Sequence, residues 1–195
     1  MAKEEILGLN LDFKLSNDVL YVGIDESNHG LFPVIFVAAF SLFEKDILPP
    51  KEGVKIRKHA NIISRVGGRD YSFLLASQGD YLKIPEKEFL GRVVGSLLYK
   101  KLGGSREEFL KMNKRRKRLD LFIDGVVGTE EKNYVRDVVS EILLMRKRMV
   151  RVLSGANYDT KYRVVNIADE LAHYLLRECT EEELYSNPNL QQLIS

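Results

Sequence analysis

The chain has 195 residues, of which 45% are hydrophobic and 30% are charged. This composition excludes a disordered or collagen-like chain, and the length predicts a single domain over 1–195. The formal net charge is +2, from 30 Lys and Arg against 28 Asp and Glu, so the total charge indicates no class of partner.

Three strands are predicted in the first part of the chain. Leu20–Asp25 is a short apolar run that ends on carboxylates, Pro33–Leu42 is rich in Val, Ile and Phe, and Tyr71–Ala76 follows a Gly67-Gly68 turn. Turn-forming residues between the first two runs predict a β-hairpin with a loop of about three to five residues. The stretch Glu44–Arg69 fits either a flexible basic loop or a short helix.

The second part of the chain alternates between helices and strands, because the apolar period changes at Pro85. The order of elements, β-β-β-α-β-α-β-α, predicts an α/β fold with a five-stranded mixed sheet flanked by helices. The predicted elements are a helix from Pro85 to Lys101, a shorter helix over Ser105–Met112, a strand over Leu119–Ile123, a helix over Glu130–Met145, a strand over Met149–Leu153 and a helix over Val164–Leu176.

Two classes of protein are disfavoured by what the sequence lacks. The single cysteine, Cys179, excludes an internal disulfide and a Cys-rich metal site. The N-terminal segment carries no apolar signal region, and the longest apolar stretch, Leu31 to Leu42, is far shorter than the roughly 20 residues of a membrane helix. We therefore expect a cytoplasmic protein with no membrane function.

Carboxylates follow two of the predicted strands. Asp25 and Glu26 close the first strand and Asp124 closes the fourth, at the end of an open α/β sheet where ligands usually bind. Carboxylates on neighbouring strands repel each other unless a cation lies between them. Oxygen ligands without Cys or clustered His favour Mg²⁺ or Mn²⁺, which support two-metal displacement at phosphorus. Asp124-Gly125 alone also fits a simple turn.

Three segments resemble type 2 ribonucleases H. Residues 22–30 (VGIDESNHG) resemble the opening G-[IV]-D-E-x-G-R-G motif, and 121–125 (LFIDG) resemble the strand of the third acid. Residues 158–168 (YDTKYRVVNIA) are similar to the D-x-K-Y-x-x-V-x-x-A stretch before a helix. The resemblance extends roughly from Leu20 to Arg177 and implies a ribonuclease H-like fold, whose order of elements is the one predicted here.

The resemblance implies that Asp25, Glu26 and Asp124 bind catalytic metal ions, with Asp159 as a fourth acid. The last helix instead reads Ala168-Asp169 with Ala172 three residues later. An A-D-x-x-A helix with an early D-E-S motif is similar to poorly characterised ribonuclease H-fold proteins, in which the helix aspartate looks like the last active-site acid. The fourth acid is therefore Asp159 or Asp169, and we favour Asp169. A loop aspartate and a solvent-facing aspartate in the first helical turn are the structural alternatives.

The sequence departs from the family in its recognition segments. Asn28, His29 and Gly30 stand where type 2 enzymes carry the Gly-Arg-Gly expected to sense the ribose. No basic segment after the second strand matches the one that these enzymes use. We predict that Asn28, His29 and Gly30 contact nucleic acid, although His29 also fits a simple turn residue. RNA, RNA–DNA hybrid and DNA all stay open as substrates, with RNA or hybrid favoured.

Basic residues cluster in three places. The clusters lie within Lys51–Arg65, in a dense run before the fourth strand, and around Arg146–Arg151. Each fits either a phosphate-binding surface or an ordinary solvated face. We predict nucleic-acid contacts for the dense run, at the end of its strand opposite Asp124 and so remote from the scissile phosphate. That run consists of Lys114, Arg115, Arg116, Lys117 and Arg118.

The sequence therefore predicts a metal-dependent nuclease of ribonuclease H-like fold with Mg²⁺ or Mn²⁺ as cofactor. The alternative is a non-catalytic nucleic-acid-binding protein of the same fold. A small-molecule hydrolase or kinase-like protein is a third interpretation, which the lack of a nucleotide-binding loop disfavours. His173, one turn after Asp169, is predicted to be a partly buried structural histidine. The sequence indicates no oligomeric state.

Overall fold

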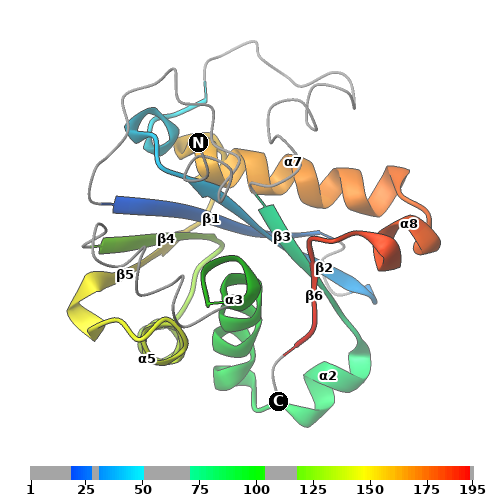
Figure 1. Ribbon diagram of the computed structural model, residues 1–195, viewed down its shortest axis with the longest axis horizontal. Coiled ribbons are helices and arrows are strands. Elements are labelled where there is room, and N and C mark those ends of the chain that lie inside the picture. Colours follow the sequence, from blue (N-terminus) through cyan, green and yellow to red (C-terminus); the bar gives the residue numbers. More distant parts are fainter. Residues whose placement is uncertain (1–18, 28–30, 51–70, 104–117, 194–195) are drawn as a thin grey trace, which may run out of the picture.

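The computed structural model of the chain describes residues 19–27, 31–50, 71–103 and 118–193. These residues form one mixed sheet in the order β5-β4-β1-β2-β3-β6 (Figure 1). All five predicted strands are present, and the two-residue β6 adds a sixth that the sequence pattern did not indicate. The strands are β1 (Val19–Ser27), β2 (Val34–Ser41), β3 (Tyr71–Ala76), β4 (Arg118–Asp124), β5 (Val150–Gly155) and β6 (Leu190–Gln191).

The sheet has an antiparallel half and a parallel half. β1 pairs with β2 and β2 with β3 in antiparallel fashion, whereas β4 lies parallel to β1 and β5 lies parallel to β4. β6 adds to β3 in parallel. This is the predicted meander followed by crossover units, and it brings the carboxyl ends of β1, β4 and β5 to one end of the sheet.

The long helices are those that the apolar period predicts. The structure adds three short helices that were not predicted, two of which begin with a capping box, at Ser77 and Thr180. For Glu44–Arg69, the structure has a short helical turn at the beginning of the stretch, and residues 51–69 lie outside the described residues. The shorter helix expected over 105–112 lies outside the described residues. The helices are α2 (Gln78–Lys83), α3 (Glu86–Gly103), α5 (Thr129–Ile142), α6 (Tyr158–Lys161), α7 (Arg163–Glu178) and α8 (Glu181–Ser186), with 3-10 turns η1 (Glu44–Ile47) and η2 (Lys147–Met149).

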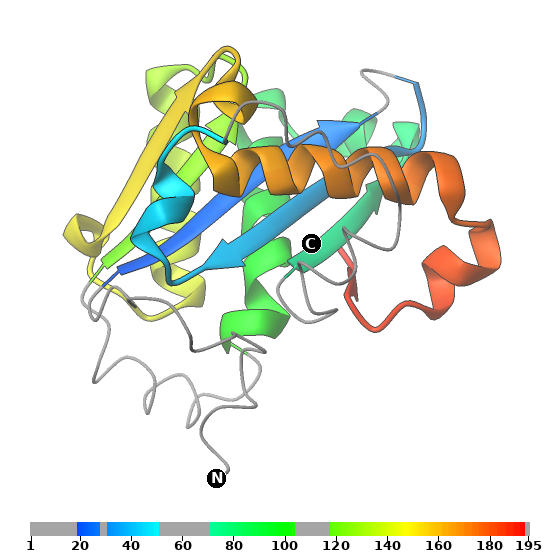
Figure 2. The same cartoon turned by 90° about the horizontal axis from the view of Figure 1, so that it is seen from above.

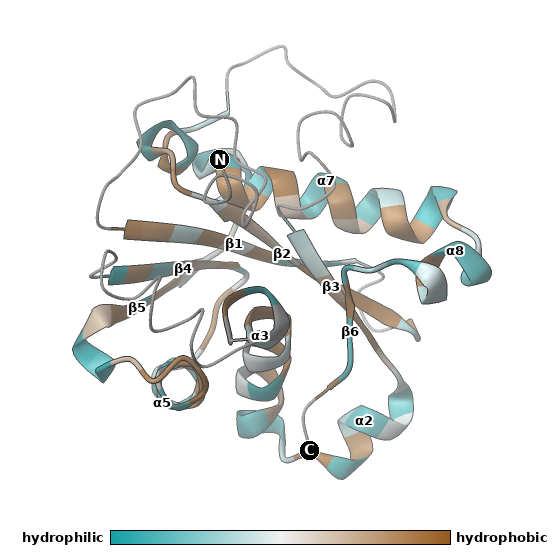
Figure 3. Cartoon of the chain, viewed as in Figure 1, coloured by the Kyte–Doolittle hydropathy of each residue, from teal (hydrophilic) through white to brown (hydrophobic). Residues whose placement is uncertain are grey.

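The helices cover the two faces of the sheet unequally. α3 and α5 pack on one face, and α7 crosses the other face (Figures 1 and 2). Apolar residues fill both interfaces (Figure 3). Alternation along β1 sends Leu20, Val22 and Ile24 into the core under α3 and α5, and Tyr21 toward α7. No helix in the described ranges is long and apolar enough to span a bilayer.

Helix α7 lies unusually close to β1 because of Gly23. A Cβ atom at this position would lie 2.2 Å from the carbonyl oxygen of Val164 on α7. This distance is a steric clash, so a residue with a side chain does not fit here. A glycine inside a strand often marks such a close approach of another backbone. The position of α7 over the sheet therefore depends on Gly23, two residues before Asp25.

A partly buried ion pair holds the start of α7. Asp46 in η1 accepts a hydrogen bond of 2.6 Å from the Ser41 hydroxyl and lies 3.6 Å from Nε of Arg163. The Arg163 amide also donates to the carbonyl of Leu48 at 2.9 Å. These contacts join the end of β2 to the first residue of α7, so the helix is fixed at the end from which it crosses the sheet.

Candidate active site

Two of the predicted acids lie side by side at the carboxyl end of the sheet. Ile24 on β1 is in register with Ile123 on β4, so Asp25 and Asp124 come next on adjacent strands that run about 4.8 Å apart. Residues two apart on a strand share a face. Asp25 therefore shares the face of Tyr21 and Gly23, and Asp124 that of Phe122, which is the face covered by α7.

The carboxyl group of Asp25 is held in an environment that opposes its charge. The pKa of Asp25 is raised from the ordinary 3.8 to about 8, mainly by burial and to a smaller extent by the charges of Asp169, Asp124 and Asp159, in that order. A hydrogen bond of 2.7 Å that the backbone amide of Glu26 donates to Oδ1 of Asp25 acts in the opposite direction. Three other predicted acids, Asp124, Asp159 and Asp169, therefore act electrostatically on Asp25.

Asp124 is fixed by the turn after β5. The backbone amide of Tyr158 donates a hydrogen bond of 2.6 Å to Oδ1 of Asp124. Gly155 is paired with Asp124 on β5, and a Cβ atom there would lie 2.4 Å from the Tyr158 ring. Gly125 has a φ of +89°, so the chain turns away at once after Asp124. These glycines let the β5–α6 turn close over the carboxylate.

Asp169 and Asp159 reach the cluster from different elements. Asp169 lies on α7, one and a half turns after the Val164 contact with Gly23, and its Oδ1 is 3.2 Å from Nε2 of His173. Asp159 lies in the short helix α6. Of these two charges, that of Asp169 raises the pKa of Asp25 more. His173 is more open than expected, because 46% of its side-chain surface is exposed.

Glu26 belongs to the other face of the sheet. It follows Asp25 directly, and adjacent residues of a strand point to opposite faces. Burial, and to a smaller extent the charge of Glu26, raise the pKa of Tyr81 on α2 to about 12. The ring of Tyr81 lies 3.9 Å from that of Phe89 on α3, on the face opposite α7. The two predicted acids of the first motif thus diverge in this structure.

The donors on the α7 face have the chemistry that a hard divalent cation requires. They include the carboxylate of Asp25 and the carboxylates whose charges raise its pKa. Ser27, two residues beyond Asp25, adds a buried hydroxyl that lacks a hydrogen-bond partner in the described part of the chain. Within that same part, however, no three or more His, Cys, Asp or Glu side chains are arranged to hold a metal ion. The donor set fits Mg²⁺ or Mn²⁺ in kind, while its side chains are not arranged around a common point.

Most of the predicted nucleic-acid contacts lie outside the described residues. This applies to Asn28, His29 and Gly30 and to 114–117 of the dense basic run. Arg118 is described, at the first position of β4 and thus at the end opposite Asp124, as the sequence predicts. Its guanidinium pairs with Asp120, with Nε 2.9 Å from Oδ1 and Nη2 donating a hydrogen bond of 3.1 Å to Oδ2.

Sequence comparison identifies no relative, and structure comparison identifies a fold. No protein-family model and no curated protein sequence matches the chain. The RNase HII in the PCNA:RNase HII complex from Archaeoglobus fulgidus is similar over 85% of this chain and 75% of that chain, with 14% identity and a TM-score of 0.50. The chain has a ribonuclease H-like fold.

Two structures of Bst-RNase HIII, one of a mutant and one in complex with Mn²⁺, are also similar to this ribonuclease H-like chain. Each shares 15% identity and covers 87% of this chain, with TM-scores of 0.45 and 0.48 respectively. The chain spans about half the length of these proteins, since the similarity covers 54% of each.

Sequence reasoning missed the residues that position the acids. Gly23, Gly155 and the amide of Tyr158 set the space and the orientation around Asp25 and Asp124, yet none of them carries chemistry of its own. The signal for Gly23 was present, because a glycine inside an apolar strand indicates a close backbone approach. Nothing in the sequence indicated that a main-chain amide would hold Asp124.

Proposed function

We propose that this protein is a metal-dependent nuclease that hydrolyses phosphodiester bonds in nucleic acid, with RNA or RNA–DNA hybrid as the favoured substrate. One observation carries the proposal: Asp25 and Asp124 lie side by side on adjacent parallel strands under α7. Helix α7 also places Asp169 close enough for its charge to raise the pKa of Asp25. The fold it shares with an RNase HII supports a nucleic-acid substrate.

The proposed cation ligands are Asp25, Asp124 and Asp169, with Asp159 as an outer acid. Bound Mg²⁺ or Mn²⁺ would neutralise the carboxylates and act as a Lewis acid on a phosphoryl oxygen. The chain supplies the positions: the Tyr158 amide fixes Asp124, and the Glu26 amide fixes Asp25. We assign Glu26 a secondary role, because the face it occupies is shared with Tyr81 rather than with the other acids.

His173 restrains Asp169 in this proposal. Its Nε2 lies 3.2 Å from Oδ1 of Asp169 across one helical turn, while nearly half of its side chain is exposed. A protonated imidazole would compete with a cation for that carboxylate, and a neutral one would leave it free. Cation binding at Asp169 is therefore favoured when His173 is neutral.

The test is cleavage of a labelled panel that contains RNA–DNA hybrid, a duplex with a single ribonucleotide, RNA, DNA duplex and single strand. Each substrate is incubated with Mg²⁺, Mn²⁺ or EDTA, with the wild-type protein and with Asp25→Asn. We expect cutting that requires the metal and is lost in the variant. Cutting of equal rate by Asp25→Asn, or cutting in EDTA, contradicts the proposal.

A second candidate is a nucleic-acid-binding protein of the same fold without catalysis. One observation favours it: in the described part of the chain, the acids are not already arranged as a group of three metal ligands. A protein of this kind binds members of the panel and cuts none of them in either metal. The same experiment therefore separates the two candidates.

A further inference from the structure

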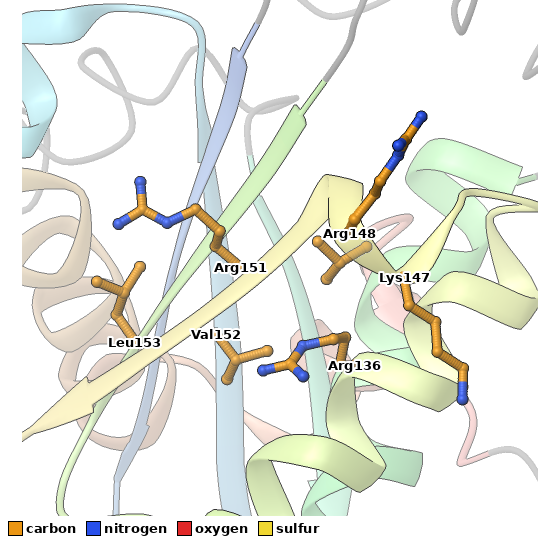
Figure 4. A pocket seen from close by; sticks show the side chains of 7 residues that line it. Arg136, Lys147, Arg148, Arg151, Val152 and Leu153 are labelled. Atoms are coloured by element: carbon orange, nitrogen blue, oxygen red, sulfur yellow. The ribbon is translucent and has the colours of Figure 1, made fainter.

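A basic pocket follows the free edge of β5, away from the acids. It has a volume of about 470 Å³ and lies between β5, η2 and α5. Four cationic side chains line it, and Figure 4 shows Arg151 and Leu153 on one side of the strand and Val152 with Arg136 on the other. The cationic residues are Arg136, Lys147, Arg148 and Arg151.

The cations around this pocket exceed the carboxylates paired with them. Lys147 pairs with Asp137 at 2.7 Å, and Arg151 lies 3.4 Å from Asp120, which it shares with Arg118. In the described ranges, these two carboxylates are the ones ion-paired with the cations of this edge. The Arg136 guanidinium donates instead to the neutral Asn133 amide oxygen, at 3.1 Å. A net positive charge therefore remains to attract an anion.

Asp120 gives the pocket a fixed orientation. Only 4% of its side-chain surface is exposed, while Arg151 and Arg118 are each about half exposed. The buried carboxylate therefore holds one pocket cation, Arg151, together with the neighbouring Arg118, while about half of each arginine side chain stays exposed to solvent. A guanidinium fork of this kind is suited to phosphate oxygens. The arrangement differs from a set of long, freely moving surface cations.

The distance between the pocket and the acids can be spanned by a few nucleotides. Arg151 pairs with Asp120 and Gly155 with Asp124 on the same two strands, so four residues separate the two levels. At about 3.3 Å per residue this is roughly 13 Å, or about four nucleotide steps at roughly 3.4 Å per step. A nucleic acid with its scissile phosphate at Asp124 can therefore reach the pocket with its own backbone.

We propose that the β5 pocket binds the phosphate backbone of the nucleic-acid substrate about four nucleotides from the point of cleavage. This inference rests on the proposed function for the identity of the ligand. Contact is with phosphates rather than bases, because cationic side chains without a base-stacking aromatic line the pocket. The pocket accordingly adds affinity and sets a minimum substrate length, without sequence preference.

Binding of a fluorescent RNA–DNA hybrid of about 20 base pairs, over about 50–200 mM salt, tests the pocket. Asp25→Asn serves as the parent so that the probe is not cut, and Arg136→Gln/Arg148→Gln removes two pocket cations that have no carboxylate partner. We expect roughly tenfold weaker binding and a salt dependence reduced by about two counterions. Arg177→Gln, an exposed arginine at the far end of α7, is the matched control and should change neither.

The outcomes for the pocket and for the nuclease can be told apart. Unchanged affinity and salt dependence in the double variant overturn the pocket proposal, even if the wild-type protein cuts the hybrid. Weakened binding without any cutting by the wild-type protein supports the pocket and contradicts the nuclease. In a cutting enzyme, the double variant should slow cleavage of the long hybrid but not of one too short to reach β5, and equal slowing of both overturns the pocket.

Discussion

The face of the sheet under α7 carries aspartates at two levels, which differ in the charged groups around them. At the level of Asp120, one carboxylate is shared by Arg118 and Arg151. Four residues further along the same strand, Asp124 lies beside Asp25, and in the part of the chain that the structure describes neither of them is ion-paired with Lys or Arg. The charge of Asp120 is balanced within the protein, whereas the charge of the upper pair is not.

This difference indicates which aspartate serves the fold and which serves a ligand. A buried charge without a partner is costly, and proteins usually pair it or neutralise it by a pKa shift. Asp25 takes the second course, with a pKa raised to about 8. A site that keeps such a group where an arginine could have been placed, as at Asp120, is arranged for a cation from outside.

The largest expected effect is a difference in cleavage rate between variants of the two aspartates of β4, Asp124 and Asp120. Asp124→Asn should lower cleavage by about 1,000-fold or more, because it removes a proposed cation ligand at the reacting phosphate. Asp120→Asn should change the rate on a short substrate by less than about threefold, since it acts only on the arginines. Initial rates in Mn²⁺ measure both, and similar losses in the two variants would break the comparison.

The next effect distinguishes the two candidates for the fourth acid. Asp169→Asn should lower cleavage by about 100-fold, and Asp159→Asn by less than about tenfold, because the Asp169 charge acts more strongly on Asp25. Thermal denaturation of both variants controls for folding. The reverse order would assign the fourth position to Asp159, as the resemblance to type 2 ribonucleases H implies.

Asp25 should make the metal-free protein sensitive to pH. Its folded-state pKa, about 8, is higher than the ordinary 3.8, so the folded protein keeps a proton that the unfolded chain releases. That contribution to stability is complete below pH 3.8 and is lost as the pH rises toward 8. Asp25→Asn avoids the loss, which is on the order of 5 kcal/mol at about pH 8.

Melting curves in EDTA provide the measurement for Asp25. Asp25→Asn should melt roughly 10–20 °C above the wild type near pH 8 and at the same temperature near pH 4. Saturating Mn²⁺ should remove most of the difference at pH 8 by stabilising the wild type alone. A gain that is equal at both pH values would mean that the Asp25 carboxyl is not responsible.

The smallest effect tests Asp120 as a structural group. Asp120→Asn should destabilise the fold by about 1–2 kcal/mol, because two guanidinium groups lose their common partner but remain partly solvated. The melting temperature should fall by roughly 3–6 °C at any pH from 5 to 8. Asp124→Asn should not produce this fall in EDTA, and if it does, Asp124 is structural as well.

The sequence predicted the fold well because the fold depends on period and order. The five main strands and three long helices follow from apolar spacing, and their order matches the architecture observed. The short elements α2, α6, α8 and β6 were missed because their few residues carry no period. The two-residue β6 forms only by pairing with β3, a long-range contact that no local pattern encodes.

The site was predictable in its residue types and less so in its geometry. Strand ends and motif spacing predicted Asp25, Asp124 and Asp169 as site residues, and in the structure the charges of Asp169 and Asp124 raise the pKa of Asp25. The adjacent residues Asp25 and Glu26 were predicted to bind metal ions together. Because β1 stays extended as far as Ser27, however, Glu26 lies on the opposite face of the sheet from Asp25. Whether a strand continues past a motif depends on its partner strand, here β2, which the motif does not contain.

Calorimetric titration of Mn²⁺ into wild-type protein, Asp25→Asn and Asp120→Asn at about pH 8 tests the central claim most directly. If the acids under α7 are a cation site, the wild type and Asp120→Asn bind Mn²⁺ with similar affinity, and Asp25→Asn loses at least about tenfold. Equal binding by all three proteins, or loss in Asp120→Asn alone, would contradict the assignment of the unpaired aspartates to a metal ion.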